Sequence, residues 1–354
     1  RHRITEVVRD GKTYRIGVLE IPSFYLNYRA RRAGDNYRSV SEDTEKALLA
    51  LSAENVDGVV VDLRGNPGGS LDEVARMLGM FLKDGPLVQI RDGNGNISVY
   101  RDDDGGKQLY AGPMTVLINL ASASASEIFA AAIQDYGRGL ILGSTTTGKG
   151  TAQVQLDSLA YGQATLTQRT FYRVTGGSTQ NRGVSPDINM VSIYDEDLGE
   201  RKAKNALKWD TIATSAYVRE RDFSTDLPTL TRRSLARQVA SPQFVFLNDI
   251  RHLGLKDKDQ KTVSLNLTAR RAEAEKMEQQ TLAFENQRRT LTGLPPYANW
   301  QVYQADLDAQ SEIRAKMKQN ERPKLPEDEA FVIEAADVLV DSIKLKNGII
   351  LAAQ

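Results

Sequence analysis

The sequence contains no cysteine and only two histidines, His2 and His252, among its 354 residues. Without cysteine there is no disulfide, no thiol nucleophile and no cysteine-ligated zinc. A Ser-His-Asp hydrolase would have to take its base from one of the two histidines. His2 lies in a charged stretch beside the first residue, and His252 lies in a helix-like segment with no serine or glycine turn next to it. We therefore expect neither histidine to be catalytic.

Long apolar runs and an excess of one charge are also missing. No run approaches the roughly 20 apolar residues that a membrane span needs. The 46 basic and 46 acidic residues cancel to a net charge of zero, which gives no electrostatic footprint for nucleic acid. The first residue is arginine instead of methionine, so we expect a piece of a longer precursor whose targeting segment is not shown.

The first half of the chain alternates short apolar strands with helices. Strands are predicted at 12–24, 59–62, 114–118 and 140–142, and helices at 41–54, 71–83 and 126–136. This alternation is typical of α/β layering. Beyond residue 195 the chain is mostly charged helix, with segments at 270–289, 306–318 and 328–345. The change predicts two domains, 1–195 and 196–354.

A glycine-rich loop, residues 62–70, follows the strand that contains three consecutive valines. Its glycines free backbone N–H groups to point outward, at the sheet edge where open α/β folds usually hold ligands. A purely structural turn that needs two glycines explains the same residues equally well.

Three serines, Ser122, Ser124 and Ser126, alternate with alanine between a predicted strand and a helix. Ser124 and Glu127 have the spacing of a capping box, so Ser124 could serve only to cap the helix. Alternatively it is a nucleophile, because the helix dipole and neighbouring N–H groups stabilise an oxyanion. Capping alone does not explain the alternation.

The segment 143–153 nearly matches a phosphate-binding P-loop, with Lys149 in the place of the P-loop lysine. However, Gly150 stands where that motif needs serine or threonine for magnesium, and the period-two pattern after it predicts a strand instead of a helix. We keep a nucleotide hydrolase only as an alternative.

A lysine offers another base for a serine nucleophile, because burial disfavours its charged form. Lys149 lies between two glycines and leads into an apolar-alternating strand, where its amine could be kept dry. Gln153, four residues on, lies on the same side of either a strand or a helix and could orient the amine. The chemistry alone predicts a Ser-Lys hydrolase.

Four motifs in order resemble the carboxyl-terminal processing proteases, especially their tail-specific subgroup. They lie at 122–132, 134–138, 148–153 and 171–180, and residues 183–188 close the core in the manner of the family. The resemblance covers 12–195, and the charged helical segment from 196 on resembles the C-terminal domain of that subgroup. It implies an α/β (α+β) core of the ClpP/crotonase-like type with buried strands and flanking helices, followed by a mainly α-helical domain.

The resemblance also implies roles for individual residues. Ser124 is the nucleophile, Lys149 the general base and Gln153 the residue that positions the lysine. The oxyanion donors are the amides of Ala125 and Gly69. Asp135 matches an acidic position that supports the site, and no metal or other cofactor is expected.

The implied function is a serine endopeptidase that recognises proteins near apolar C-terminal tails, in the bacterial periplasm, at the inner membrane or cell wall, with an adaptor protein as a further partner. Members of the family have a PDZ domain ahead of the core that binds the substrate's C-terminus, and nothing in this chain resembles it. A non-catalytic peptide-binding scaffold is the third alternative. Cleavage of an unfolded protein without ATP separates the protease from both alternatives.

Overall fold

The computed structural model describes residues 1–102, 107–156, 159, 161–194, 196–317 and 325–348. The chain folds into two compact units that interleave along the sequence. The first comprises Arg1–Met190, Tyr194–Ser234 and Val332–Gln354, and the second Val191–Ile193 and Leu235–Phe331.

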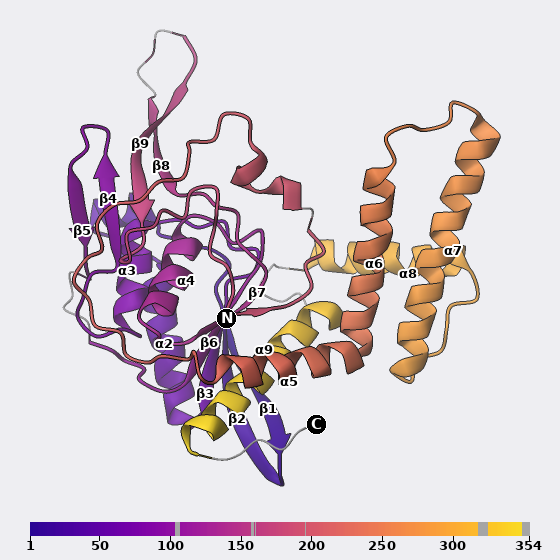
Figure 1. Cartoon of the computed structure of the whole chain (residues 1–354), viewed down its shortest axis with the longest axis horizontal. Coiled ribbons are helices and arrows are strands. Elements are labelled where there is room, and N and C mark those ends of the chain that lie inside the picture. The colour runs from indigo at the N-terminus through magenta and orange to yellow at the C-terminus, as the bar shows by residue number, and fades with distance from the viewer. Residues whose placement is uncertain (103–106, 157–158, 160, 195, 318–324, 349–354) are drawn as a thin grey trace. The chain divides into compact units, whose positions relative to one another are not determined.

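A six-stranded sheet forms the centre of the first unit (Figure 1). Its strands, in spatial order, are β1 (His2–Arg9), β2 (Lys12–Glu20), β3 (Gly58–Asp62), β6 (Met114–Ile118), β7 (Leu140–Gly143) and β10 (Ile188–Asn189). The β1–β2 pair is antiparallel and the other neighbours are parallel. Every residue of β3, β6 and β7 is buried, which confirms the buried strands predicted from the apolar runs.

Three helices complete the core around this sheet: α2 (Val40–Ala53), α3 (Leu71–Gly79) and α4 (Ala125–Asp135), whereas the short helix α1 (Tyr28–Ala33) has no buried residue. The side chain of Ser70 caps α3 by accepting the N–H of Glu73, and the apolar positions of α3 face the core. Phe81 and Phe129 meet edge to face with their ring centroids 5.8 Å apart. The loops that follow β3, β6 and β7 leave the sheet at one edge, because these strands are parallel.

A second, antiparallel sheet has the order β5-β4-β9-β8 and is visible at the upper left of Figure 1. Its strands are β4 (Val88–Asp92), β5 (Ile97–Tyr100), β8 (Thr151–Leu156) and β9 (Ala164–Tyr172). The period-two pattern after Lys149 is therefore a strand, as predicted, and the helix that a P-loop requires does not follow. Two 3-10 turns, η1 (Glu196–Leu198) and η2 (Glu200–Lys202), come later in the chain.

The last helix, α9 (Pro326–Lys346), contributes the residues from Val332 onward to the first unit. Its apolar face is buried, and Leu339 lies so close to Gly58 that a Cβ there would be 2.7 Å from it. Asp341 of α9 pairs with Arg233 of α5 (Leu227–Ala240) at 3.1 Å. The helical spacing predicted at 328–345 thus reflects burial against residues far away in the sequence.

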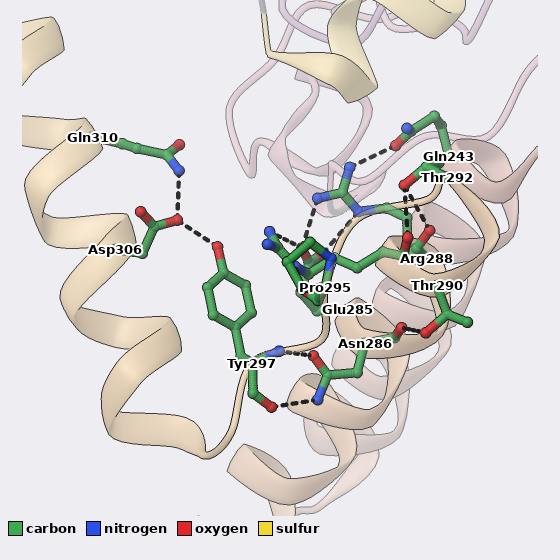
Figure 2. Close-up of polar contacts among 11 residues, drawn as sticks. Gln243, Glu285, Asn286, Arg288, Thr290, Thr292, Pro295, Tyr297, Asp306 and Gln310 are labelled. Carbon is green, nitrogen blue, oxygen red and sulfur yellow. Dashed lines mark hydrogen bonds and ion pairs between the residues drawn. The ribbon is translucent and has the colours of Figure 1, made fainter.

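The second unit consists mainly of α6 (Pro242–Asp259), α7 (Leu267–Leu291) and α8 (Trp300–Lys316). Figure 2 shows the polar contacts at the α7–α8 corner. The Asn286 side chain bonds both backbone groups of Tyr297, accepting its N–H at 2.7 Å and donating to its carbonyl at 2.9 Å. Burial, together with a hydrogen bond to Asp306, raises the pKa of Tyr297 to about 12. These contacts fix the turn between two helices that share few buried apolar residues.

Candidate active site

The turn into α4 places Ser124 in an unusual backbone conformation. Its φ of 55° and ψ of −113° lie where residues with a side chain are strained. Ser124 is the N-cap residue of α4 and is only partly buried. Such strain persists only where the surrounding structure enforces it, and it gathers at functional sites.

The neighbouring serines have structural roles. Ser122 is completely buried and donates to the Leu63 carbonyl at 2.8 Å. Ser126 is equally buried and donates to the Asn66 carbonyl at 2.9 Å. The alternation is explained by two buried anchors on either side of one partly exposed serine.

Glu127 joins the serine turn to the lysine loop. Its buried carboxylate accepts the backbone N–H of Ser124 at 2.8 Å and that of Lys149 at 2.9 Å. The Gly148 N–H and the Thr146 hydroxyl donate to its other oxygen, at 2.8 and 2.6 Å. Burial raises the pKa of this carboxyl, although the four donors work in the opposite direction. The capping-box spacing identified Glu127 as a helix cap, but gave no sign of the lysine loop that it binds.

Lys149 and Gln153 follow this anchor. Lys149 is partly buried between Gly148 and Gly150, and the N–H of Gly150 donates to the Gln180 side chain at 2.9 Å. Gln153 lies on β8 just after a register shift and is exposed. Among the described residues, the structure contains no hydrogen bond between Ser124 Oγ and Lys149 Nζ, nor between Lys149 and Gln153. It therefore brings the backbones of the serine and lysine segments together without closing the side-chain contacts.

The glycine-rich loop packs directly against the serine turn. A Cβ on Gly68 would lie 2.9 Å from the Ser124 Cβ, and one on Gly69 would lie 2.3 Å from the Phe24 carbonyl oxygen. Both glycines have positive φ, 103° and 146°, so any other residue would be strained as well as crowded. The double glycine is thus required by close backbone contact.

Two backbone amides at this junction are not engaged. Across the described residues, the N–H groups of Gly69 and Ala125 donate to no protein acceptor. Ala125 is the first residue of α4, where the amide has no partner within the helix. Gly68, in contrast, donates to Asn66 Oδ1 at 2.9 Å. The free amides are the two that the family resemblance assigns to an oxyanion.

Asp135 lies at the far end of α4 from Ser124 and is buried. Arg173 donates to both of its carboxylate oxygens, with Nε 3.1 Å from each. This ion pair anchors the segment after β9 to α4.

Neither a metal-ligand cluster nor a helix able to span a membrane is present among the described residues. No three acidic or histidine side chains gather in a way that could hold a metal ion. None of the described helices combines the length and the apolar character needed to cross a bilayer. His2 and His252 are both exposed.

Both parts of the chain, the mixed α/β core and the helical region that follows it, match known protein families. Residues 15–190 match Peptidase family S41, and residues 193–344 match the C-terminal domain of tail specific protease. The chain belongs to the S41 peptidases and has the C-terminal domain of their tail-specific members, which confirms the family and the mixed α/β core followed by helices.

Several individual proteins are similar to parts of this chain. The chain is 41% identical over 285 residues to the tail-specific protease of Haemophilus influenzae, covering 77% of this chain and 39% of that protein. It is 36% identical over 202 residues to a carboxy-terminal-processing protease of Bartonella bacilliformis, covering 52% and 46%. The photosystem II D1 C-terminal processing protease superposes with a TM-score of 0.44 and 29% identity, covering 53% of this chain and 48% of that one. The chain thus spans less than half the length of each of these relatives.

Proposed function

We propose that this chain is the catalytic part of a serine endopeptidase with a Ser124 nucleophile and a Lys149 general base. The observation that carries the proposal is the strained, partly exposed Ser124, with two unengaged amides beside it and one carboxylate binding it to the lysine loop. These parts supply the nucleophile, the charge stabilisation and the base that acyl transfer needs.

In the proposed reaction, the neutral Lys149 amine takes the Ser124 proton as Oγ attacks the scissile carbonyl. The amides of Ala125 and Gly69 donate to the oxyanion. The lysinium then protonates the leaving amine. In the second half of the reaction, the Lys149 amine takes a proton from water as the water oxygen attacks the acyl carbonyl, and the lysinium then returns a proton to Ser124 Oγ as the acid product leaves. Gln153 orients the amine, and Asp135 supports the site through Arg173.

The Ser124 and Lys149 side chains must approach each other for this reaction. Their backbones are already held by Glu127, so the proposed approach involves the lysine side chain and the start of β8. The register shift between Ala152 and Gln153 lies in that stretch. Binding of an extended substrate beside β8, an edge strand of its sheet, would favour the closed arrangement.

The proposed substrates are proteins with apolar C-terminal tails, and the proposed location is the bacterial periplasm, at the inner membrane or cell wall, with an adaptor protein as a further partner. The support is the tail-specific C-terminal domain and the tail-specific relative from Haemophilus influenzae. The preference is measured as kcat/KM for one unfolded protein that ends in either apolar or charged residues. Equal values for both ends would contradict it.

The proposed chemistry is tested by incubating the chain with a carboxymethylated, unfolded protein in the absence of ATP and metal. We expect cleavage that is lost in Ser124→Ala and kept in Ser122→Ala. A requirement for ATP and magnesium would favour a nucleotide hydrolase, and binding without cleavage would favour a peptide-binding scaffold.

A further inference from the structure

Asn66 lies at the junction of three chain segments and is completely buried. Its side chain donates to the Ile21 carbonyl at 2.9 Å and accepts the Gly68 N–H at 2.9 Å. Its own carbonyl accepts the N–H of Ala123 at 3.0 Å and the hydroxyl of Ser126 at 2.9 Å. One residue thus binds the segment after β2, the glycine-rich loop and the serine turn.

The bond to Gly68 decides which amide of the glycine-rich loop is available. Asn66 Oδ1 occupies the Gly68 N–H, whereas the next amide, that of Gly69, has no acceptor among the described residues. The carbonyl of Phe24 holds the loop from the other side by accepting the N–H of Ser70 at 2.9 Å. The free amide therefore has a fixed direction.

The Asn66 carbonyl fixes the second amide. It binds the residue before Ser124 and, through Ser126, the first turn of α4, so Ala125 lies between two anchored positions. Both free amides are consequently positioned by the same residue. An asparagine suits this place because its amide accepts and donates at once, which an ionised aspartate cannot do.

We infer that Asn66 is a positioning residue that sets the Gly69 and Ala125 amides for the oxyanion. This inference rests on the proposed peptidase function and deepens it. Asn66 itself touches neither substrate nor the reacting atoms. Loss of one oxyanion donor lowers kcat by roughly 100- to 1,000-fold, so misplacing one should lower kcat by about 10- to 100-fold.

The test compares wild-type protein with Asn66→Ala in steady-state cleavage of a peptide substrate. We expect kcat to fall by about 10- to 100-fold with KM changed less than about threefold, because the defect arises as charge develops on the carbonyl oxygen. The affinity for a peptide aldehyde, which forms a hemiacetal with Ser124, should fall by the same factor as kcat. The affinity for the matching peptide alcohol should stay unchanged.

Gln89→Ala is the matched control. Gln89 is also a buried amide, and it donates to two backbone carbonyls, those of Arg173 and Ala213. It should lose stability while keeping kcat and the aldehyde-to-alcohol affinity ratio. If Asn66→Ala keeps that ratio and differs from wild type only in stability, the inference is wrong. If wild-type protein shows no Ser124-dependent cleavage, the proposed function itself fails.

Asn66→Asp provides a second variant that keeps the shape of the side chain. Its ionised form can accept from Gly68 but places an oxygen against the Ile21 carbonyl, whereas its protonated form restores the donor. The ratio of variant to wild-type kcat should therefore rise as the pH falls, in protein shown by circular dichroism to be folded. If the ratio of Asn66→Asp kcat to wild-type kcat does not change with pH, the inference is wrong. This test remains available if Asn66→Ala does not fold.

Discussion

The Glu127 carboxylate accepts the backbone N–H of Lys149 at 2.9 Å, although the two residues are 22 positions apart and belong to different loops. The same carboxylate oxygen accepts the N–H of Ser124 at 2.8 Å. A single buried acid therefore sets the separation between the proposed nucleophile and the proposed base. Its substitution should affect activity and stability together.

In Glu127→Gln, an amide NH2 replaces one of the two carboxylate oxygens, and each of these oxygens accepts two hydrogen bonds in the wild type. We expect a loss of about 2 kcal/mol in the free energy of unfolding, from buried donors left without acceptors. Peptide cleavage should fall at least tenfold, because the serine and lysine segments are no longer held together. Urea denaturation and steady-state kinetics measure the two effects. Full activity in Glu127→Gln would show that the link is not needed.

The stability of the wild-type protein should also depend on pH through Glu127. Its pKa in the folded state is raised above the ordinary 4.5, so the folded protein binds a proton more tightly than the unfolded chain. The free energy of unfolding should therefore fall as the pH rises through the window above 4.5 and then level off. Glu127→Gln has no ionisable group at this position, so its free energy of unfolding should lack this pH dependence. If the free energies of unfolding of wild type and Glu127→Gln differ by the same amount at every pH, the prediction is wrong.

Ser124→Ala should abolish peptide cleavage while leaving the protein folded. The hydroxyl is the reacting group, whereas the α4 cap keeps its bond from the Ser124 backbone N–H to Glu127. Ser122→Ala should keep much of the activity and lose about 2 kcal/mol of stability, because it removes two hydrogen bonds, the one to the Leu63 carbonyl and the one from the Asn119 N–H. Cleavage by purified Ser124→Ala would refute the nucleophile. A large fall in melting temperature with activity retained would favour a helix cap alone.

Lys149→Arg should be inactive, since arginine does not give up its proton in a protein. EDTA and ATP should have no effect. Near wild-type rates in Lys149→Arg would exclude the lysine as base, and inhibition by EDTA would require a metal that the proposal does not include.

Asp135→Asn should damage stability more than chemistry. The Asp135–Arg173 ion pair is largely buried, so breaking it should cost about 3 kcal/mol. Arg38→Gln is the control, because Arg38 is 82% exposed in its pair with Asp43 and its loss should cost less than about 1 kcal/mol. At temperatures well below unfolding, Asp135→Asn should keep kcat/KM within about tenfold of wild type. A 1,000-fold loss in folded protein would assign Asp135 a role in the reaction itself.

Local patterns in the sequence predicted most of the elements near the site. The strand at 114–118 has the predicted bounds, and α4, predicted at 126–136, spans Ala125–Asp135. The strand after Lys149 was predicted from its period of two, and this distinguished the segment from a P-loop. Periodicity and capping succeed here because they depend on neighbours within a few residues. The roles of Ser124 and Lys149 stay predictions that the experiments above test.

The amino-acid sequence by itself determined the buried strands, the serine turn, the double glycine and the family. Only the tertiary structure decided what these parts contact: Glu127 binds the lysine loop, Asn66 binds the serine turn, and α9 packs with residues from the start of the chain. The reason is physical. A helix or strand pattern records which side of a segment avoids water, but hydrogen bonds between segments 20 to 60 residues apart form only after the fold has brought their buried polar groups together.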